Sequence, residues 1–474
     1  MYPAQTSFIP VQIALARFLE NQGWRAIFSN YPYWYLGTTP FRFLTGPILP
    51  IFLVVVHQLL PGLNLFEILL GLIWITFPLG AVGVYLLVRE LREDRLVAII
   101  AAAFYLLGPI IPLLFRFFDG LYLITLSFLP YVLILYLKLL KQWQRKTAIY
   151  LILLIAGLIL LDTSIIPSLF FAMTAVFLAE TGWKRVEEKL KNSLLLMAYS
   201  VLLATVWYTP GYWLTLLTAP SLAGKTLLSV AISLPRLLAV ALAFFLAIFS
   251  TRFFKKKNLF RDFCFFWLFI FGFLTLARFM ADPDFWLDWS AYGIELQMGI
   301  GMGLSLVLSK IKSKSRQTYV SVFLSILLII SWLFLIKQGV IDTFQKEIEP
   351  SVEYRIGKKL TEIVEPGEKV FLSGTTAFWL NAFFDIPQVR GGVDKAAVHP
   401  TWDKAAWEIR EGTKVELSEK WLRELGVNYL VVHDQTSEEF YHDFTYPDKF
   451  EKGNFQKLYQ QNGDRIYQLV DQSD

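Results

Sequence analysis

Two carboxylates inside long apolar segments are the residues of this sequence best placed to do chemistry. Asp162 interrupts an apolar stretch in "LLDTSIIPS", and Glu295 lies in the otherwise apolar beginning of another stretch. A charge at membrane depth is costly, so such residues usually serve a function. A carboxylate can act as a general base or bind a divalent cation through its oxygens. Asp162, at a break in a helix, could therefore form a polar site.

Further candidates lie between the apolar segments. The segment "FRFFDG" contains Arg116 and Asp119, which could face a phosphate and a sugar hydroxyl. Residues 277–296 form the densest patch of polar and aromatic residues, and Arg42 could bind a lipid phosphate. The predicted catalytic residues are Asp119, Asp162, Asp284 and Asp288, and the predicted substrate-binding residues are Arg42, Arg116, Arg278 and Glu295.

Each candidate also has a structural interpretation that involves no ligand. Asp162, Thr163 and Ser164 can all cap the helix that follows them. The charged residues of 115–120 and 277–296 can be solvated loop residues, although Glu295 fits this interpretation least because it lies in the otherwise apolar start of a span. Arg42 can anchor the chain at the membrane interface. These alternatives stay open at the level of the sequence.

Composition places the chain in a membrane. It has 474 residues, of which 55% are hydrophobic and 16% aromatic, and apolar runs of about 20 residues identify membrane spans. The net charge of +5 is mild and does not imply nucleic acid as a partner. The single cysteine excludes a disulfide within the chain, and the four histidines lie outside the main apolar block, which excludes a histidine-based metal site in the membrane.

The apolar pattern predicts a polytopic bundle, mainly α, with about ten spans. The pair 147–162 and 163–180 is either two crossings or one long helix that is broken at Asp162. The expected spans are 66–88, 95–115, 121–140, 147–162, 163–180, 191–209, 226–249, 259–279, 290–308 and 318–336.

Basic residues predict the orientation of this bundle. Five connecting segments carry three or four lysines and arginines each, whereas the alternate connections carry almost none. Short basic loops stay in the cytoplasm. The basic segments are 89–95, 138–146, 184–191, 252–257 and 310–316. The alternation is consistent with ten crossings and places residues 1–65, and the chain after about residue 338, outside the cell.

The two outer parts differ in character. Residues 1–65 are expected to form an extracytoplasmic loop, with a short amphipathic helix at 8–23 and a re-entrant or surface-lying helix at 46–62. This loop is either translocated by the first span or preceded by a further helix, and we favour the second interpretation. Residues 66–337 form the bundle, and 338–474 are expected to form a small extracytoplasmic α/β domain with a hairpin at "QNGD". Within it, 373–409 could touch a glycan or pack inside the domain.

The chain resembles the GT-C-like membrane proteins, which are polytopic glycosyltransferases that use lipid-phosphate sugar donors. More narrowly, it looks like the 6-pyruvoyl-tetrahydropterin synthase-related membrane proteins. The stretches that carry the resemblance are "YWYLGTTPFRFLTGPILP", "LLATVWYTPGYWLTLL", "DWSAYGIELQMG", "VFLSGTTAFWLNAFFDIPQVRGGVD" and "ELGVNYLVVHD". Together they extend over nearly the whole chain.

The resemblance implies a first outer loop that begins with an acidic residue and continues to a G-x-P stretch. The G-x-P-like part is present as Gly37–Pro40, but the place of the acid falls near Gln5 or before residue 1. A histidine that is frequent in the fourth or fifth span of the family is replaced here, and Asp162 is the candidate for its position. Another carboxylate would have to do the chemistry.

The resemblance therefore implies sugar transfer from a polyprenyl-phosphate donor at the outer face, with the bilayer and the lipid-linked sugar as partners. A divalent cation is a candidate cofactor. The alternative is a non-catalytic scaffold or lipid-handling protein of the cell envelope, which the missing acid favours. A transporter would predict inverted repeats and paired broken helices, and the sequence shows one broken segment.

Overall fold

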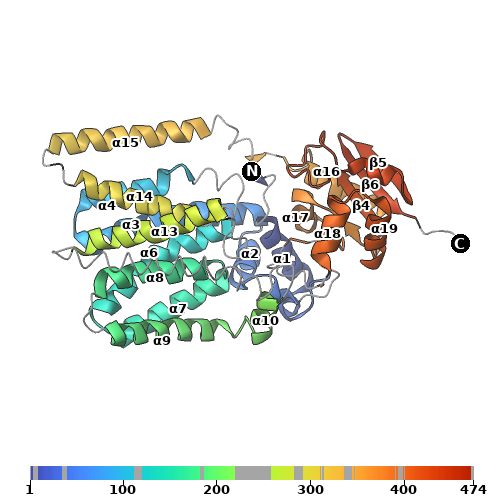
Figure 1. Ribbon diagram of the computed structural model, residues 1–474. Helices are drawn as coiled ribbons and strands as arrows, with labels where there is room; N and C mark the ends of the chain where they lie inside the picture. Colours follow the sequence, from blue (N-terminus) through green and yellow to red (C-terminus); the bar gives the residue numbers. More distant parts are fainter. Residues whose placement is uncertain are drawn as a thin grey trace.

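The structure is a computed structural model in which an apolar helical bundle carries a small α/β domain at one end (Figure 1). It describes residues 2–3, 9–34, 40–110, 120–181, 186–218, 258–281, 292–309, 311, 314–335, 344–345, 347–389, 391–392, 399 and 401–470.

The N-terminal region, residues 1–65, contains the two expected helices. Helix α1 spans Ile9–Gln22 and α2 spans Ile48–Leu59, with short 3-10 helices at Trp24–Phe28 and Phe41–Phe43. Ten of the fourteen residues of α1 are buried, because α2 lies against one side and α17 (Gly374–Phe383) against another. Helix α1 is thus an internal connector between the bundle and the small domain, which its amphipathic pattern does not predict.

Most of the expected spans are helices in the structure. Helices α7 and α8 are separate and divide at Asp162–Ser164, so this stretch is not one continuous helix. The expected span 226–249 lies outside the described residues. The bundle helices are α3 (Leu65–Arg92), α4 (Arg95–Leu107), α6 (Gly120–Lys141), α7 (Arg145–Leu161), α8 (Ile165–Thr181), α9 (Val186–Ala204), α10 (Pro210–Thr218), α13 (Leu259–Ala281), α14 (Gly293–Leu308) and α15 (Lys314–Leu335).

Three of these helices are long and apolar enough to cross a bilayer. Within the described residues they cover Leu65–Arg92, Tyr122–Lys141 and Leu259–Leu276, while α4, α8 and α14 are shorter apolar helices. Large apolar side chains also face outward, such as Tyr319 on α15, which is 72% exposed. The chain is a membrane protein of mainly helical structure, and the count of ten spans stays a prediction.

The two ends of the bundle have different chemistry. At one end, which we call the domain end, Phe66 at the start of α3 stacks on Trp379 of α17 with ring centres 5.2 Å apart. At the opposite or basic end, Lys141 closing α6 lies 3.2 Å from Glu90 near the end of α3. The guanidinium of Arg92 lies 5.9 Å from the ring centre of Phe260 at the start of α13. The described parts of the basic segments gather at this end, which is the pattern that the positive-inside rule requires.

Local signals explain where the first spans begin and end. Asn64 and Glu67 form a reciprocal capping box at the start of α3, with both hydrogen bonds at 2.9 Å. Glu93 adopts a left-handed backbone conformation that ends α3, and Asp94 caps α4 through the N–H groups of Leu96 and Val97.

The small domain has a four-stranded sheet in the order β3-β4-β6-β5. Strands β3 (Val370–Phe371) and β4 (Tyr429–His433) are parallel, and β6 (Asp464–Leu469) pairs antiparallel with β4 and with β5 (Phe455–Gln461). The predicted hairpin is confirmed, because Asn462 and Gly463 both have positive φ, as a tight turn between twisted strands requires. The remaining elements are β2 (Phe344–Gln345), α16 (Val352–Ile363), α17 (Gly374–Phe383), α18 (Trp402–Arg410), α19 (Val415–Glu424) and the 3-10 helix at Pro447–Glu451.

The N-terminal region and the small domain are joined by polar contacts. Arg17 of α1 lies 3.2 Å from the carboxylate of Asp385 and donates to the carbonyl of Asn381. The indole N–H of Trp34 donates to the Asn381 side chain at 2.8 Å. Strand β1 (Tyr2–Pro3) pairs with β2. The two parts therefore lie on the same side of the bundle.

Candidate functional site

Three of the predicted site residues, Asp162, Arg42 and Glu295, can be placed with their side chains. Arg278 lies on α13, but its side chain is outside the description. The other four, Asp119, Asp284, Asp288 and Arg116, lie outside the described residues, and the roles predicted for them stay predictions.

Asp162 forms a local turn between α7 and α8. It follows α7 in an extended conformation, and its carboxylate accepts the backbone N–H of Ser164 at 3.0 Å and the Ser164 hydroxyl. Both contacts lie in the turn that leads into α8, and aspartate commonly forms such turns with the backbone two residues on. The carboxylate is half-buried and keeps lone pairs for a further donor, since each oxygen accepts more than one hydrogen bond.

Aromatic side chains surround the polar break at Asp162. The hydroxyl of Thr163 lies 3.3 Å from that of Tyr212, whose ring centre lies 4.5 Å from that of Tyr208. Phe43 packs its ring 5.9 Å from Tyr212. Phe43 thus brings the 3-10 helix that carries Arg42 into the neighbourhood of the break.

Arg42 and Asp162 are both without an ion-pair partner among the described residues. Arg42 is half-buried in its 3-10 helix. Gly46, four residues further on, packs directly on the end of α7, where a Cβ atom would overlap the carbonyl oxygen of Leu160. Close packing of this kind needs glycine. Asp162 at the break, Arg42 and the loop that contains Gly46 therefore belong to one region at the domain end.

Glu295 belongs to a second cluster, which is buried between three helices. Its side chain is 1% exposed, and one oxygen accepts hydrogen bonds from the hydroxyls of Tyr122 on α6 and Ser168 on α8, the latter at 2.6 Å. Its backbone carbonyl accepts the indole N–H of Trp267 at 2.7 Å. The other carboxylate oxygen, Oε2, has no partner among the described residues. The sequence singled out Glu295 but not Tyr122 or Ser168.

An apolar groove of about 280 Å³ runs between α2, α3, α6 and α7. Each helix contributes side chains at helical spacing, so the groove has four apolar walls. On α7 the wall ends at Leu161, the residue before Asp162, and at the other side it includes Ile48 of α2, two residues after Gly46. The lining residues are Ile48, Leu49, Phe52, Leu72, Thr76, Ile124, Phe128, Leu153, Leu154, Gly157, Leu158 and Leu161.

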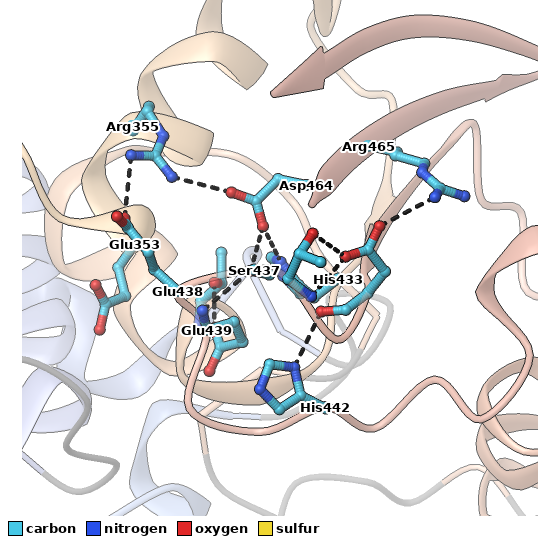
Figure 2. A network of polar contacts seen from close by, with 12 residues as sticks. Glu353, Arg355, His433, Ser437, Glu438, Glu439, His442, Asp464 and Arg465 are labelled. Atoms are coloured by element: carbon cyan, nitrogen blue, oxygen red, sulfur yellow. Dashed lines mark hydrogen bonds and ion pairs between the residues drawn. The ribbon is translucent and has the colours of Figure 1, made fainter. Parts of the chain in front are cut away.

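The small domain contains a buried polar network, shown in Figure 2. His433 at the end of β4 is fully buried, and its Nδ1 lies 2.8 Å from the carboxylate of Asp464 at the start of β6. Asp464 also accepts hydrogen bonds from Ser437 at 2.5 Å and from Arg355 of α16 at 3.0 Å. The network therefore ties two strands and a helix to the loop after β4.

Burial and neighbouring charges act in opposite directions on these groups. Burial lowers the pKa of His433, but the hydrogen bond to Asp464 and the negative charges of Glu439, Asp464 and Asp443 outweigh it and leave the pKa above its ordinary value. Burial raises the pKa of Asp464, and its contacts with His433, Ser437 and Arg355 reverse that effect and lower the pKa overall. Both pKa shifts favour the charged forms, a protonated His433 beside an ionised Asp464, and this pair stabilises the fold.

The described part of 373–409 packs within the structure. Glu439 accepts the backbone N–H groups of Thr375 and Thr376 at the start of α17, at 2.8 and 2.9 Å. A Cβ atom at Gly391, whose φ is +72°, would overlap the ring of Trp34. These contacts favour the packing interpretation over the glycan-binding one for the residues described.

Within the part of the chain that the structure describes, no three His, Cys, Asp or Glu side chains gather to hold a metal ion. The carboxylates of 282–288, on which the expected divalent cation depends, are outside that part. The cation stays a prediction.

No protein-family model matches this chain, and no curated protein sequence matches it. Among solved structures, the chain is similar to the crystal structure of ArnT from Cupriavidus metallidurans in the apo state. The two are 14% identical with a TM-score of 0.49, over 99% of this chain and 95% of that one. A likeness with a TM-score below 0.5 carries no argument about function, so the function must be argued from the chain's own residues.

Proposed function

We propose that this chain is a GT-C-like membrane glycosyltransferase that takes a sugar from a polyprenyl-phosphate donor at the domain end of the bundle. The proposal places that end outside the cell, following the distribution of basic residues. The narrower resemblance to the 6-pyruvoyl-tetrahydropterin synthase-related membrane proteins is part of the proposal.

The observation that carries the proposal is the apolar groove that ends beside a polar break. A polyprenyl chain is a long apolar group with an anionic head, so its site needs an apolar channel that leads to a cation. The groove between α2, α3, α6 and α7 supplies apolar walls, and its α7 wall ends next to Asp162. Arg42 lies in the region of the same break and has no ion-pair partner among the described residues.

The two charged side chains have distinct roles in the proposed reaction. Arg42 holds the phosphate of the donor and stabilises the charge that develops on it as the leaving group. Asp162 accepts the proton of the acceptor hydroxyl while the acceptor oxygen forms a bond to the anomeric carbon. The bond between that carbon and the phosphate oxygen breaks, and polyprenyl phosphate leaves with the electron pair.

A lipid-handling protein without catalysis is the second candidate. It is favoured by the local contacts of Asp162, because a carboxylate that already accepts two hydrogen bonds from Ser164 is less available as a base. The groove serves this function equally well, so the two candidates differ only in the chemistry at Asp162.

A turnover assay separates the two candidates. The purified chain in nanodiscs receives a polyprenyl-phosphate donor with a labelled sugar, and loss of label from the lipid is measured, so that transfer to water also counts. Asp162→Asn keeps an acceptor oxygen for the turn, because asparagine forms the same side-chain-to-backbone turns as aspartate, but removes the base. We expect turnover to fall about 100-fold or more with an unchanged melting temperature.

Asp94→Asn is the matched control, because Asp94 caps α4 at the basic end of the bundle and should not affect turnover. Full turnover by Asp162→Asn would leave Asp162 with only a structural role. A wild-type chain that binds the donor without consuming it would be a lipid-handling protein.

A further inference from the structure

A small cavity at the basic end of the bundle lies away from the region of Asp162. It has a volume of about 110 Å³ and lies between the end of α6 and the first turns of α9. A water molecule takes about 30 Å³ in the liquid, so the space holds a few waters or one small polar group. Its lining residues with polar groups are Tyr136, Lys141, Trp143, Glu188, Lys189, Asn192 and Ser193.

Two donors in this cavity are available to a ligand. Two hydroxyls of the lining already have hydrogen-bond partners within the protein. Those of Tyr136 and Ser193 lie 2.7 Å apart, and Ser193 donates to the carbonyl of Lys189. The ammonium of Lys189 and the amide of Asn192 have no hydrogen-bond or ion-pair partner among the described residues. An anion with several acceptor oxygens would satisfy both.

The third nitrogen donor, Lys141, is held only weakly. Its ammonium lies 3.2 Å from Glu90, but the two side chains are 40% and 31% exposed. An exposed pair of this kind contributes little to stability, so Lys141 can turn toward an anion in the cavity. Glu188 is the one carboxylate among the lining residues, so Lys141, Lys189 and Glu188 together carry a net positive charge.

The cavity lies at the depth of lipid headgroups. Helix α6, a candidate span, ends at Lys141, and Trp143 just beyond it is 48% exposed, which is typical of an interface anchor. Trp143 also lines the cavity itself, so its exposed ring is apolar surface directly beside the polar groups. An acyl chain can lie against this ring, whereas a free phosphate ion would not use it.

We infer that this cavity binds the headgroup of an anionic phospholipid in the leaflet at the basic end. Lys189 and Asn192 donate to the phosphodiester, with Lys141 as an additional cation, and basic pockets between membrane helices bind acidic headgroups in this way. A headgroup that also carries hydroxyls, such as the glycerol of phosphatidylglycerol, donates to Glu188. The inference does not depend on the proposed sugar transfer.

The test measures lipid retention by native mass spectrometry of the full chain. The protein is reconstituted into nanodiscs of phosphatidylglycerol, phosphatidylethanolamine and phosphatidylcholine in equal amounts, and the lipids that stay bound are counted. We expect phosphatidylglycerol to be enriched. Lys189→Gln should lower that enrichment about fivefold, which corresponds to about 1 kcal/mol for one lysine, and Asn192→Ala should lower it as well.

Lys191→Gln removes the same charge from an exposed position on the same helix and is the control. Equal losses in Lys189→Gln and Lys191→Gln would reduce the effect to general surface charge and overturn the site. A preference for phosphatidylethanolamine, or displacement of the bound lipid by inorganic phosphate alone, would also overturn it. Unchanged melting curves show that the variants are folded.

Discussion

A buried carboxyl group such as Glu295 must be satisfied by the residues around it. Two hydroxyls donate to one of its oxygens, while the other oxygen has no partner among the described residues. An unpartnered buried polar group costs about 1–3 kcal/mol. The cluster is therefore only partly satisfied within the described residues.

We expect Glu295→Ala to destabilise the protein more than Glu295→Gln. Alanine removes the acceptor that the hydroxyls of Tyr122 and Ser168 share and empties part of the core. The two hydroxyls lie 2.8 Å apart, so one can then donate to the other, and we expect the lost acceptor to cost about 1–3 kcal/mol. Glutamine keeps one acceptor oxygen in place. Thermal unfolding followed by tryptophan fluorescence in detergent measures the difference, and equal melting temperatures would mean that the hydrogen bonds do not stabilise the bundle. Substrate binding by Glu295 predicts in addition that Glu295→Gln loses turnover without losing stability.

His433 makes the stability of the small domain depend on pH. Because the folded-state pKa lies above the ordinary value of 6.5, the folded state binds more protons between these two values than the unfolded state does. The contribution of His433 is therefore complete below pH 6.5 and is lost as the pH rises through the folded-state pKa. Arg355 and Asp464, which complete the network, stay charged throughout this range.

The unfolding temperature should accordingly fall as the pH is raised above 6.5 in the wild type, and the fall should be smaller in His433→Gln. His442→Gln is the control, because His442 is exposed and, in the described part of the chain, has one hydrogen bond, from its Nδ1 to the carbonyl of Asp434. If His433→Gln has the same pH profile as the wild type, the histidine does not titrate as the contacts with Asp464 require.

Sequence separation decides which of these residues could be found from the sequence. The contact of Asp162 with Ser164 spans two residues, so a local structural role could be predicted as an alternative. Tyr122 and Ser168 contact Glu295 across 173 and 127 residues of chain. No local sequence pattern predicts which partner a hydroxyl in a helix will contact at such a separation. The role of His433 depends on Asp464 in the same way.

At the scale of elements, the groove depends on the absence of a side chain at Gly157. Gly157 lies in the lining of the groove on α7, and a Cβ atom there would meet nothing within 4 Å. A larger side chain can therefore enter the groove without displacing a helix. Glycine in a helix interior costs about 0.5–1 kcal/mol relative to alanine, so a leucine at this position should not lower stability.

Gly157→Leu is expected to lower the binding of polyprenyl phosphate severalfold while the protein stays as stable as the wild type or becomes more so. Photo-crosslinking with a diazirine-bearing polyprenyl phosphate measures the binding. Gly71→Leu on α3 is the matched control, because Gly71 also has open space at its Cβ but does not line the groove. Unchanged crosslinking in Gly157→Leu would place the lipid elsewhere.

Elements with strong local signals could be predicted from the sequence. The hairpin follows from "NG" between alternating runs, and the start of α3 follows from the capping box at Asn64 and Glu67. Helix α1 shows the limit of this approach. Its sequence predicts one buried face, but α17, which comes more than 350 residues later, covers another. Which helices enclose the groove is likewise a property of the packing.

At the scale of the whole molecule, the structure shows which parts of the chain lie on the same side of the bundle, and the sequence predicts which side of the membrane this is. The contacts of Arg17 and Trp34 with Asn381 fix the N-terminal region and the small domain on the same side of the bundle. That this side is outside the cell rests on the basic residues at the other end. Both statements can be tested together with single-cysteine variants. The only native cysteine, Cys264, is buried and should label poorly.

We expect Phe28→Cys and Tyr446→Cys to react with a membrane-impermeant maleimide in intact cells, because these side chains are 74% and 47% exposed at the domain end. Trp143→Cys at the basic end should react only after the membrane is permeabilised. If Phe28→Cys and Tyr446→Cys both require permeabilisation, the arrangement is correct but inverted, and the proposed sugar transfer moves to the cytoplasmic face. If these two positions label on opposite sides, the joint between the N-terminal region and the small domain is wrong, and the loop that carries Arg42 can no longer be assigned to the side of that domain.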